Sequence, residues 1–367
     1  MTEVAETPPS SSPPPESVPE ETSPALRTTG LAKRYGRVRV VNGLDLDVPR
    51  GKIYGFLGRN GAGKTTTIRM LMGILKPDRG EIEFFGQRTR RTTIPLKRRI
   101  GYVSQSQHFY PWMSARQLGR FVSGFYPNWD AAEYDRLLRV LEIPPERRTS
   151  QLSGGMRMKL ALALALAHHP ELLILDEPTA GLDPVAQREF LEIVRNQSRN
   201  HGRTTLFSTH RIDEVERAAD KVGIIDEGVM RYEGDLADLR AEVRRVIEIP
   251  RPAAPTPDSE TATPAPEFSG DGDAISDPPP AAVAPLETET KPFAPPPIPP
   301  ARPGNPFADN GDYELLRDES LPDQRQLIYR CRLAEPWSAP VPDGWKTETL
   351  SLEDIFLAYA GLKVAEV

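Results

Sequence analysis

The stretch GFLGRNGAGKTTT at 55–67 has the residue types and the spacing of a phosphate-binding loop. It fits the pattern G-x-x-x-x-G-K-[ST] through Gly58, Gly63, Lys64 and Thr65, after an apolar run and before a helix-forming stretch. Glycines in such a loop let backbone N–H groups wrap around phosphate oxygens, and the helix start adds positive potential. Lys64 would reach the β- and γ-phosphates, and Thr65 would supply a hydroxyl to Mg²⁺. A glycine-rich turn with a chance lysine is the alternative, which the context disfavours.

Two acids end a second apolar run, LLILDEP at 172–178. Asp176 stands where a carboxylate can hold the Mg²⁺ shell. Glu177, one residue further, could polarise the attacking water as a general base. A strand that simply ends in solvated acids is the alternative, and the phosphate loop in the same chain favours the catalytic interpretation.

Two more polar residues follow apolar runs. His210 comes after TTLFST and before a helical stretch, and Gln105 leaves the run IGYV. Ligands of doubly wound sheets bind at the carboxyl ends of the strands, so His210 could reach the γ-phosphate side and Gln105 could contact Mg²⁺ or water. Taken alone, each would more often be an ordinary surface or core residue.

Strands and helices alternate from about residue 26 to residue 249, with buried-strand patterns such as KIYGFL and helical ones such as VAQREFLEIVRNQ. This alternation predicts an α/β fold, a parallel sheet with helices on both faces. Mostly helical patterning over 106–165 interrupts it and predicts an inserted helical subdomain. The apolar run LALALALA at 160–167 is too short to cross a bilayer and predicts a buried helix.

Proline and charge divide the chain. Of its 39 prolines, seven lie in 1–24 and eighteen in 250–306. We therefore predict a disordered Pro/Ser-rich tail over 1–25 and a disordered Pro-rich linker over 250–306, which would be a spacer or an SH3-type ligand. Residues 25–249 carry 37 Lys and Arg against 27 Asp and Glu. A basic core suits nucleotide phosphates, nucleic acid or a membrane surface, and charge alone does not choose among them.

A small C-terminal subdomain is predicted over 307–367. RQLIYRCRL at 325–333 reads as a strand that could pair with RRVIEIP at 244–250, and SLEDIFLAYAG reads as a helix with Ser351 as its N-cap and Gly361 near its end. The single cysteine, Cys331, excludes an internal disulfide and fits a reducing compartment. With no secretory pattern at 1–10 and no window of roughly 20 apolar residues, we expect a soluble, cytoplasmic chain.

These features together resemble the ATP-binding cassette (ABC) ATPases over roughly residues 26–240. Six landmarks follow in the order of that family: the Walker A loop at 58–65, the Q-loop at Gln105, the signature LSGGM at 152–156, Walker B at 172–176 with Glu177, the D-loop ending at Asp183, and the switch His210. The resemblance implies an ABC ATPase fold over 26–245, with an antiparallel β subdomain beside the helical one. Tyr35 matches the aromatic that stacks on adenine in the family, although a strand aromatic is the plain alternative.

The resemblance also implies an ATPase that uses ATP and Mg²⁺, with Glu177, His210 and Gln105 as catalytic residues. The implied Mg²⁺ contacts are Thr65, Gln105 and Asp176, and the implied ATP contacts are Tyr35, Gly58, Arg59, Asn60, Gly61, Ala62, Gly63, Lys64, Thr65 and Thr66. In the family, the signature of one subunit faces the ATP of the other, so Ser153, Gly154 and Gly155 would contact phosphate across a dimer, most simply a homodimer. Met156 replaces the glutamine common in the family, which puts the strength of that dimer in doubt.

The C-terminal LSLEDIFLAYAG is similar to the ending of ATPase subunits that pair with separately encoded exporter permeases. We therefore expect an ATP-hydrolysing transporter subunit on the cytoplasmic face of the membrane, driving a permease, with no nucleic acid as partner. The alternatives are a soluble ABC ATPase acting on ribosomes or nucleic acid, and a scaffold that binds ATP without turnover. Seven aromatics lie in 107–130, and we predict Phe109, Tyr110 and Trp112 as the exposed ones that receive the permease.

Overall fold

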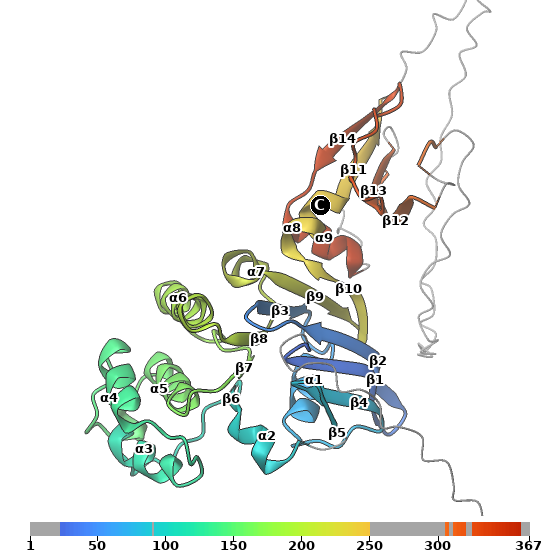
Figure 1. Ribbon diagram of the computed structural model, residues 1–367. Coiled ribbons are helices and arrows are strands. Elements are labelled where there is room, and N and C mark those ends of the chain that lie inside the picture. The colour runs from blue at the N-terminus through green and yellow to red at the C-terminus, as the bar shows by residue number, and fades with distance from the viewer. Residues whose placement is uncertain (1–22, 90–91, 250–304, 308–310, 321–324, 361–367) are drawn as a thin grey trace, which may run out of the picture.

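The computed structural model describes residues 23–89, 92–249, 305–307, 311–320 and 325–360 (Figure 1). The predicted tail over 1–25 and linker over 250–306 lie outside these residues, apart from 23–25 and 305–306. Gly361, predicted near the end of the last helix, also lies outside them.

A six-stranded sheet forms the centre of the molecule, with strand order β10-β9-β3-β8-β7-β6. Strands β9, β3, β8, β7 and β6 run parallel and β10 is antiparallel to β9, which confirms the predicted parallel sheet. The strands are β3 (Ile53–Gly58), β6 (Ile100–Val103), β7 (Leu172–Asp176), β8 (Thr204–Thr209), β9 (Lys221–Asp226) and β10 (Val229–Asp235). Every residue of β3, β7 and β8 is buried, as expected for parallel strands covered on both faces.

Alternating side chains of these strands enter two separate cores. Leu173 and Leu175 of β7 pack into the core shared with α5 (Gly154–Leu166) and α6 (Pro184–His201). Leu172 and Ile174 pack into the other core, which holds α1 (Lys64–Leu71) and an antiparallel sheet. Besides α5, the helices that flank the sheet are α1 (Lys64–Leu71), α2 (Ile94–Arg98), α6 (Pro184–His201) and α7 (Ile212–Ala218). Figure 1 shows α1 on one side of the sheet and α6 and α7 on the other.

An antiparallel sheet of order β2-β1-β4-β5 covers the α1 side. Its strands are β1 (Leu26–Tyr35), β2 (Val38–Val48), β4 (Arg79–Phe84) and β5 (Gln87–Thr89). It lies beside α1 (Figure 1). This sheet matches the antiparallel part that the family resemblance implied.

Helices occupy the stretch predicted to be helical: α3 (Ala115–Ser123), α4 (Ala131–Val140), the 3₁₀ turn η1 (Thr149–Gln151) and α5 (Gly154–Leu166). Side chains cap all three α-helices: Ser114 accepts from the Gln117 N–H, Asp130 from the Glu133 N–H and Ser153 from the Met156 N–H. Residues 160–166 are all buried, which confirms the predicted buried helix. The limits 106–165 of a separate helical subdomain remain a prediction.

The C-terminal segments form a third sheet, of order β12-β13-β11-β14. After α8 (Leu236–Glu242), its strands are β11 (Val243–Glu248), β12 (Tyr313–Asp318), β13 (Gln326–Cys331) and β14 (Trp345–Thr349), and α9 (Leu352–Tyr359) closes the chain. Strands β11 and β13 pair as predicted, with Arg244 opposite Tyr329. Ser351 caps α9 as predicted, accepting from the Asp354 N–H. The sheet extends beyond the β10 edge of the central sheet (Figure 1), and α9 packs against α7 and β9.

Candidate active site

The loop between β3 and α1 depends on glycine at two positions. Gly63 has φ 106°, and a Cβ there would lie 2.7 Å from the Val40 carbonyl oxygen. A Cβ at Gly58 would lie 2.6 Å from the carbonyl oxygen of Ile225 on the neighbouring β9. The loop therefore packs tightly against β2 and β9, and it curves back so that Lys64 Nζ donates to the Gly58 and Arg59 carbonyls at 2.7 and 3.0 Å.

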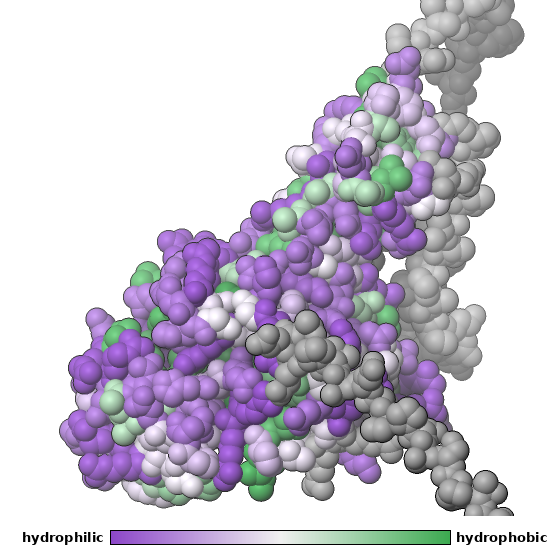
Figure 2. Space-filling model, viewed as in Figure 1, coloured by the Kyte–Doolittle hydropathy of each residue, from purple (hydrophilic) through white to green (hydrophobic). Residues whose placement is uncertain are grey.

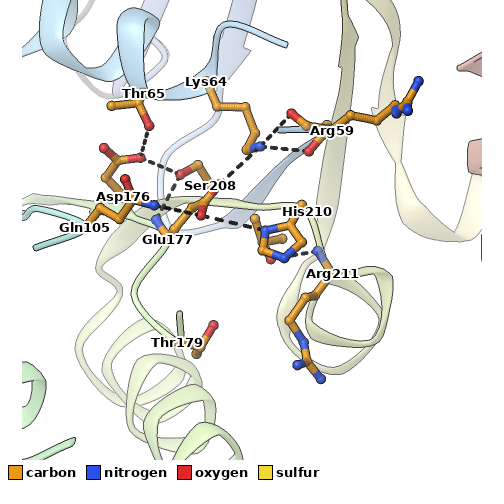
Figure 3. Close-up of polar contacts among 12 residues, drawn as sticks. Arg59, Lys64, Thr65, Gln105, Asp176, Glu177, Thr179, Ser208, His210 and Arg211 are labelled. Carbon is orange, nitrogen blue, oxygen red and sulfur yellow. Dashed lines mark hydrogen bonds and ion pairs between the residues drawn. The ribbon is translucent and has the colours of Figure 1, made fainter. Parts of the chain in front are cut away.

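Lys64 is buried and faces an acid. Its Nζ lies 3.2 Å from Glu177 Oε1 (Figure 3). Burial lowers the pKa of Lys64, and the nearby Glu177 carboxylate opposes that shift. The Lys64 ammonium group is thus stabilised in the cleft by one carboxylate and two carbonyl groups. A phosphate group would offer it a further anionic partner.

Asp176 ends β7 beside two hydroxyl groups. Thr65 Oγ1 donates to Asp176 Oδ1 at 3.0 Å, and Ser208 Oγ, at the end of β8, donates to the same oxygen at 2.9 Å (Figure 3). Burial raises the pKa of Asp176, and the two hydroxyl donors partly offset this. A carboxylate and a hydroxyl oxygen this close are hard oxygen donors of the kind Mg²⁺ prefers, so the residues present fit that ion.

Glu177 stands in the middle of the cluster, with backbone φ 45°. Its N–H donates to Ser208 Oγ at 3.0 Å, which anchors its backbone to β8. Gln105 Nε2 donates to Glu177 Oε2 at 3.1 Å, and His210 Nδ1 lies 3.7 Å from the same oxygen. Three residues predicted from separate stretches, Gln105, Glu177 and His210, are thus brought together (Figure 3).

A cleft of about 340 Å³ opens over this cluster. Its lining residues are Val40, Asn60, Gly61, Gly63, Lys64, Thr65, Thr66, Gln105 and Glu177. Tyr35 is exposed at the end of β1 and is not among the residues that line the cleft. Lys33 Nζ lies 5.9 Å from the centroid of its ring. Asp183 caps α6 by accepting from the Val185 and Ala186 N–H groups.

The Ser153–Gly155 turn does not line this cleft. Ser153 and Gly154 are exposed at the start of α5, where the Ser153 hydroxyl caps the helix at 3.2 Å from the Met156 nitrogen. A Cβ at Gly154 would meet no atom within 4 Å. Within a single chain, therefore, no steric contact requires glycine at this position.

The site contains one residue, Ser208, that the sequence analysis did not predict. A hydroxyl two residues before His210, at the end of a strand, was a usable signal for it.

The prediction of exposed aromatics is partly wrong. Phe109 is not exposed, because its ring packs against the large core. The exposed aromatics of residues 107–130 are Tyr110, Trp112, Phe121 and Phe125, which form a chain of rings with centroids 5.2 to 5.5 Å apart.

Known proteins share this fold and these motifs. A family model described as ABC transporter matches residues 41–180. The bacitracin transport ATP-binding protein BcrA of Bacillus licheniformis is 38% identical over 231 residues, 62% of this chain and 74% of that protein. The daunorubicin/doxorubicin resistance ATP-binding protein DrrA of Streptomyces peucetius is 36% identical over 237 residues, 60% of this chain and 68% of that protein. A solved ATP-binding subunit of an ABC transporter superposes with a TM-score of 0.54 and 31% identity, covering 59% of this chain and 92% of that one.

The chain belongs to the ABC transporter ATP-binding proteins. It is an ATP-binding and ATP-hydrolysing subunit of an ABC transporter, built on the ABC ATPase fold. Within the part of the chain that the structure describes, no helix has the length and apolarity needed to cross a bilayer.

Proposed function

We propose that two copies of this chain close around two ATP molecules and thereby drive a separate membrane permease, in the direction of export. The observation that carries the proposal is the separation of two half-sites. Lys64, Gln105 and Glu177 line one cleft, with His210 3.7 Å from Glu177, while Ser153 and Gly154 are exposed outside it. A second chain could bring its own turn to the phosphate end of the cleft, where bare N–H groups at a helix start bind anions.

In this proposal each residue of the cleft has a separate task. Lys64 and the loop N–H groups of Gly61 to Thr66 bind the phosphates, and Tyr35 stacks on adenine. Thr65, Asp176 and Gln105 would hold Mg²⁺, which supplies charge neutralisation at the phosphate oxygens. Asp183 lies at the start of α6, on the loop that would face the second chain.

Glu177 takes the proton of the attacking water. Its present partner Lys64, 3.2 Å away, is also the cation that a phosphate group needs. ATP binding would draw Lys64 toward the phosphate and leave the Glu177 carboxylate free to accept a hydrogen bond from water. His210, 3.7 Å from Glu177, would then contact the γ-phosphate and keep the carboxylate oriented.

The names of the relatives support export. One is a bacitracin transport protein, another confers resistance to daunorubicin and doxorubicin, and a third serves Nod factor export. The exposed ring chain of Tyr110, Trp112, Phe121 and Phe125 offers the permease an apolar contact with polar edges. The chain would thus sit at the cytoplasmic face of the membrane, and the permease would select the substrate.

The experiment is a test of ATP-dependent dimerisation with Glu177→Gln. This variant binds ATP but lacks the general base, so it should accumulate as a dimer in saturating Mg-ATP, as measured by light scattering after gel filtration. Lys64→Ala is the matched control, because it should lose nucleotide binding and remain a monomer. A Glu177→Gln protein that stays monomeric in Mg-ATP would overturn the dimer mechanism.

The permease is tested with the same variant. Tagged Glu177→Gln protein should retain one polytopic membrane protein from the membrane fraction of its source cells, and should do so more strongly with ATP than without. Recovery of ribosomes or nucleic acid in its place would contradict the transporter role.

A further inference from the structure

A buried acid outside the cleft joins the two loops that carry Glu177 and His210. Glu214 lies in the first turn of α7 and its side chain is 1% exposed. One loop follows β7 and contains Glu177 and Thr179, and the other leads from Thr209, the last residue of β8, through His210 to α7. Glu214 contacts both loops.

Each carboxylate oxygen of Glu214 serves one loop. Thr179 Oγ1 donates to Glu214 Oε1 at 2.5 Å, and Thr209 Oγ1 donates to Oε2 at 2.6 Å. Arg211 Nε lies 3.3 Å from Oε1, so the buried charge also has a cationic neighbour. Hydrogen bonds between hydroxyls and a carboxylate are short and about twice as strong as neutral ones.

Each threonine also takes part in backbone hydrogen bonds of its own segment. Thr209 Oγ1 also accepts from the Arg211 N–H at 3.0 Å, which closes the turn around His210. The Thr179 carbonyl accepts from the Leu182 N–H at 3.1 Å, and the Glu177 carbonyl accepts from the Ala180 N–H at 3.1 Å. These hydrogen bonds, together with the peptide link between Thr179 and Ala180, connect the Glu177 backbone through Glu214 and Thr209 to the His210 turn.

We propose that Glu214 is a positioning residue for ATP hydrolysis, which keeps the Glu177 loop and the His210 loop in one fixed arrangement. The inference rests on the proposed roles of Glu177 and His210. A carboxylate suits this position because both of its oxygens accept, and both loops present a hydroxyl donor. Without Glu214, no shared acceptor would fix the two loops to each other, and the 3.7 Å distance between His210 Nδ1 and Glu177 Oε2 could change.

The test is the variant Glu214→Gln, which preserves shape and removes one acceptor. The amide oxygen can accept from one threonine, but the amide NH₂ must face the other, whose hydroxyl then loses its acceptor. We expect kcat to fall about tenfold, within the roughly 100-fold cost of a misplaced catalytic group. The dissociation constant for ATP should stay within about twofold, because Glu214 does not line the cleft.

The matched control is Glu216→Gln on the same helix. Glu216 is a partly exposed acid that pairs with Arg240 at 2.6 Å and contacts neither loop through a hydrogen bond in the described residues. Its removal should leave both kcat and ATP affinity unchanged.

A double-mutant cycle separates positioning from simple stabilisation. If Glu214 acts by holding His210 against Glu177, Glu214→Gln should cost less than about twofold in kcat once His210→Ala is present. Equal costs in both backgrounds would overturn the proposal, and so would an unchanged kcat or a loss confined to KM. If Glu214→Gln melts below the assay temperature, Thr209→Val removes one bond of the same set and is measured in the same cycle, with the same outcomes.

The proposed function is tested independently of this inference. In the Glu177→Gln background, Glu214→Gln should still form the ATP-dependent dimer. Failure of Glu177→Gln alone to dimerise would contradict the proposed function, whereas failure only after Glu214→Gln is added would contradict the positioning role, because the acid would then be needed for dimer assembly.

Discussion

Burial sets the charge state of single side chains, and His168 shows this most clearly. It follows α5, its ring stacks on Tyr126 with centroids 4.0 Å apart, and its Nε2 lies 3.3 Å from the Ile100 carbonyl oxygen. Burial lowers the pKa of His168 to about 4. The folded chain therefore holds this imidazole neutral at pH values where the unfolded chain has already protonated it.

The pKa of His168 predicts a loss of stability in acid. An unfolded histidine has a pKa near 6.5, so between that pH and pH 4 the unfolded state binds more protons and the free energy of unfolding falls as the pH falls. At pH 4.5 this group should cost about 2 to 3 kcal/mol relative to pH 7. His168→Phe keeps the stack on Tyr126. Its free energy of unfolding, measured with urea at pH 7 and pH 4.5, should therefore fall by about 2 to 3 kcal/mol less than that of the unsubstituted chain. His201→Phe, at an exposed histidine, is the control, and if both variants lose the same stability in acid, His168 is not the group responsible.

At this scale, the residues within contiguous motifs could be predicted and those that join motifs could not. Lys64 and Asp176 each stand at a strand end or helix start that local patterning already indicates. Thr179 and Glu214 could not be predicted because their contact joins positions 35 residues apart, a pairing that only the order of strands in the sheet decides.

Among the elements, α3 and α4 approach each other because one residue has no side chain. Gly119 of α3 faces Tyr134 of α4, and a Cβ at Gly119 would lie 2.2 Å from Tyr134 Cε1. Tyr134 cannot move aside freely, since it is buried and its hydroxyl donates to the Ala115 carbonyl at 2.7 Å. This contact fixes α4 against α3, the helix that carries the exposed Phe121.

Gly119→Ala should therefore destabilise the chain by overpacking, by about 1 to 3 kcal/mol. Gly124→Ala is the matched control, because a Cβ there would lie 3.6 Å from its nearest neighbour, an ordinary contact. Urea unfolding of the two variants measures the difference. Equal midpoints would show that α3 and α4 can separate without cost.

Element types were predictable and side-chain directions were not. The apolar run at 160–166 and the cap at Ser351 follow from local rules that the structure obeys. Which aromatics face solvent depends on the rotation of α3 against α4 and on the loop before it, so Phe109 was misplaced while Phe121 and Phe125 were overlooked.

For the whole molecule, the position of the exposed aromatics matters more than their number. Figure 2 shows a mostly hydrophilic face whose paler side chains gather along the lower edge, where Figure 1 places α2 and α3. Trp112 and Phe125 are 62% and 60% exposed, and the cleft over Lys64 and Glu177 belongs to other elements. A partner could thus bind the ring chain without blocking ATP.

This separation predicts that membrane association and ATP hydrolysis can be uncoupled. Replacing two rings by serine, as Trp112→Ser with Phe125→Ser, removes most of the apolar contact area that would anchor a permease segment, and hot-spot aromatics of this kind each contribute about 2 kcal/mol or more. We expect the share of the protein that sediments with the membranes of its source cells to fall at least tenfold, while the ATPase rate of the purified chain stays within about twofold. Val140→Ser is the control, because Val140 is equally exposed on α4 but belongs to no ring contact. Unchanged membrane association in the double variant would move the permease contact to another face, and a matching loss of ATPase activity would show that the rings serve the fold and not the partner.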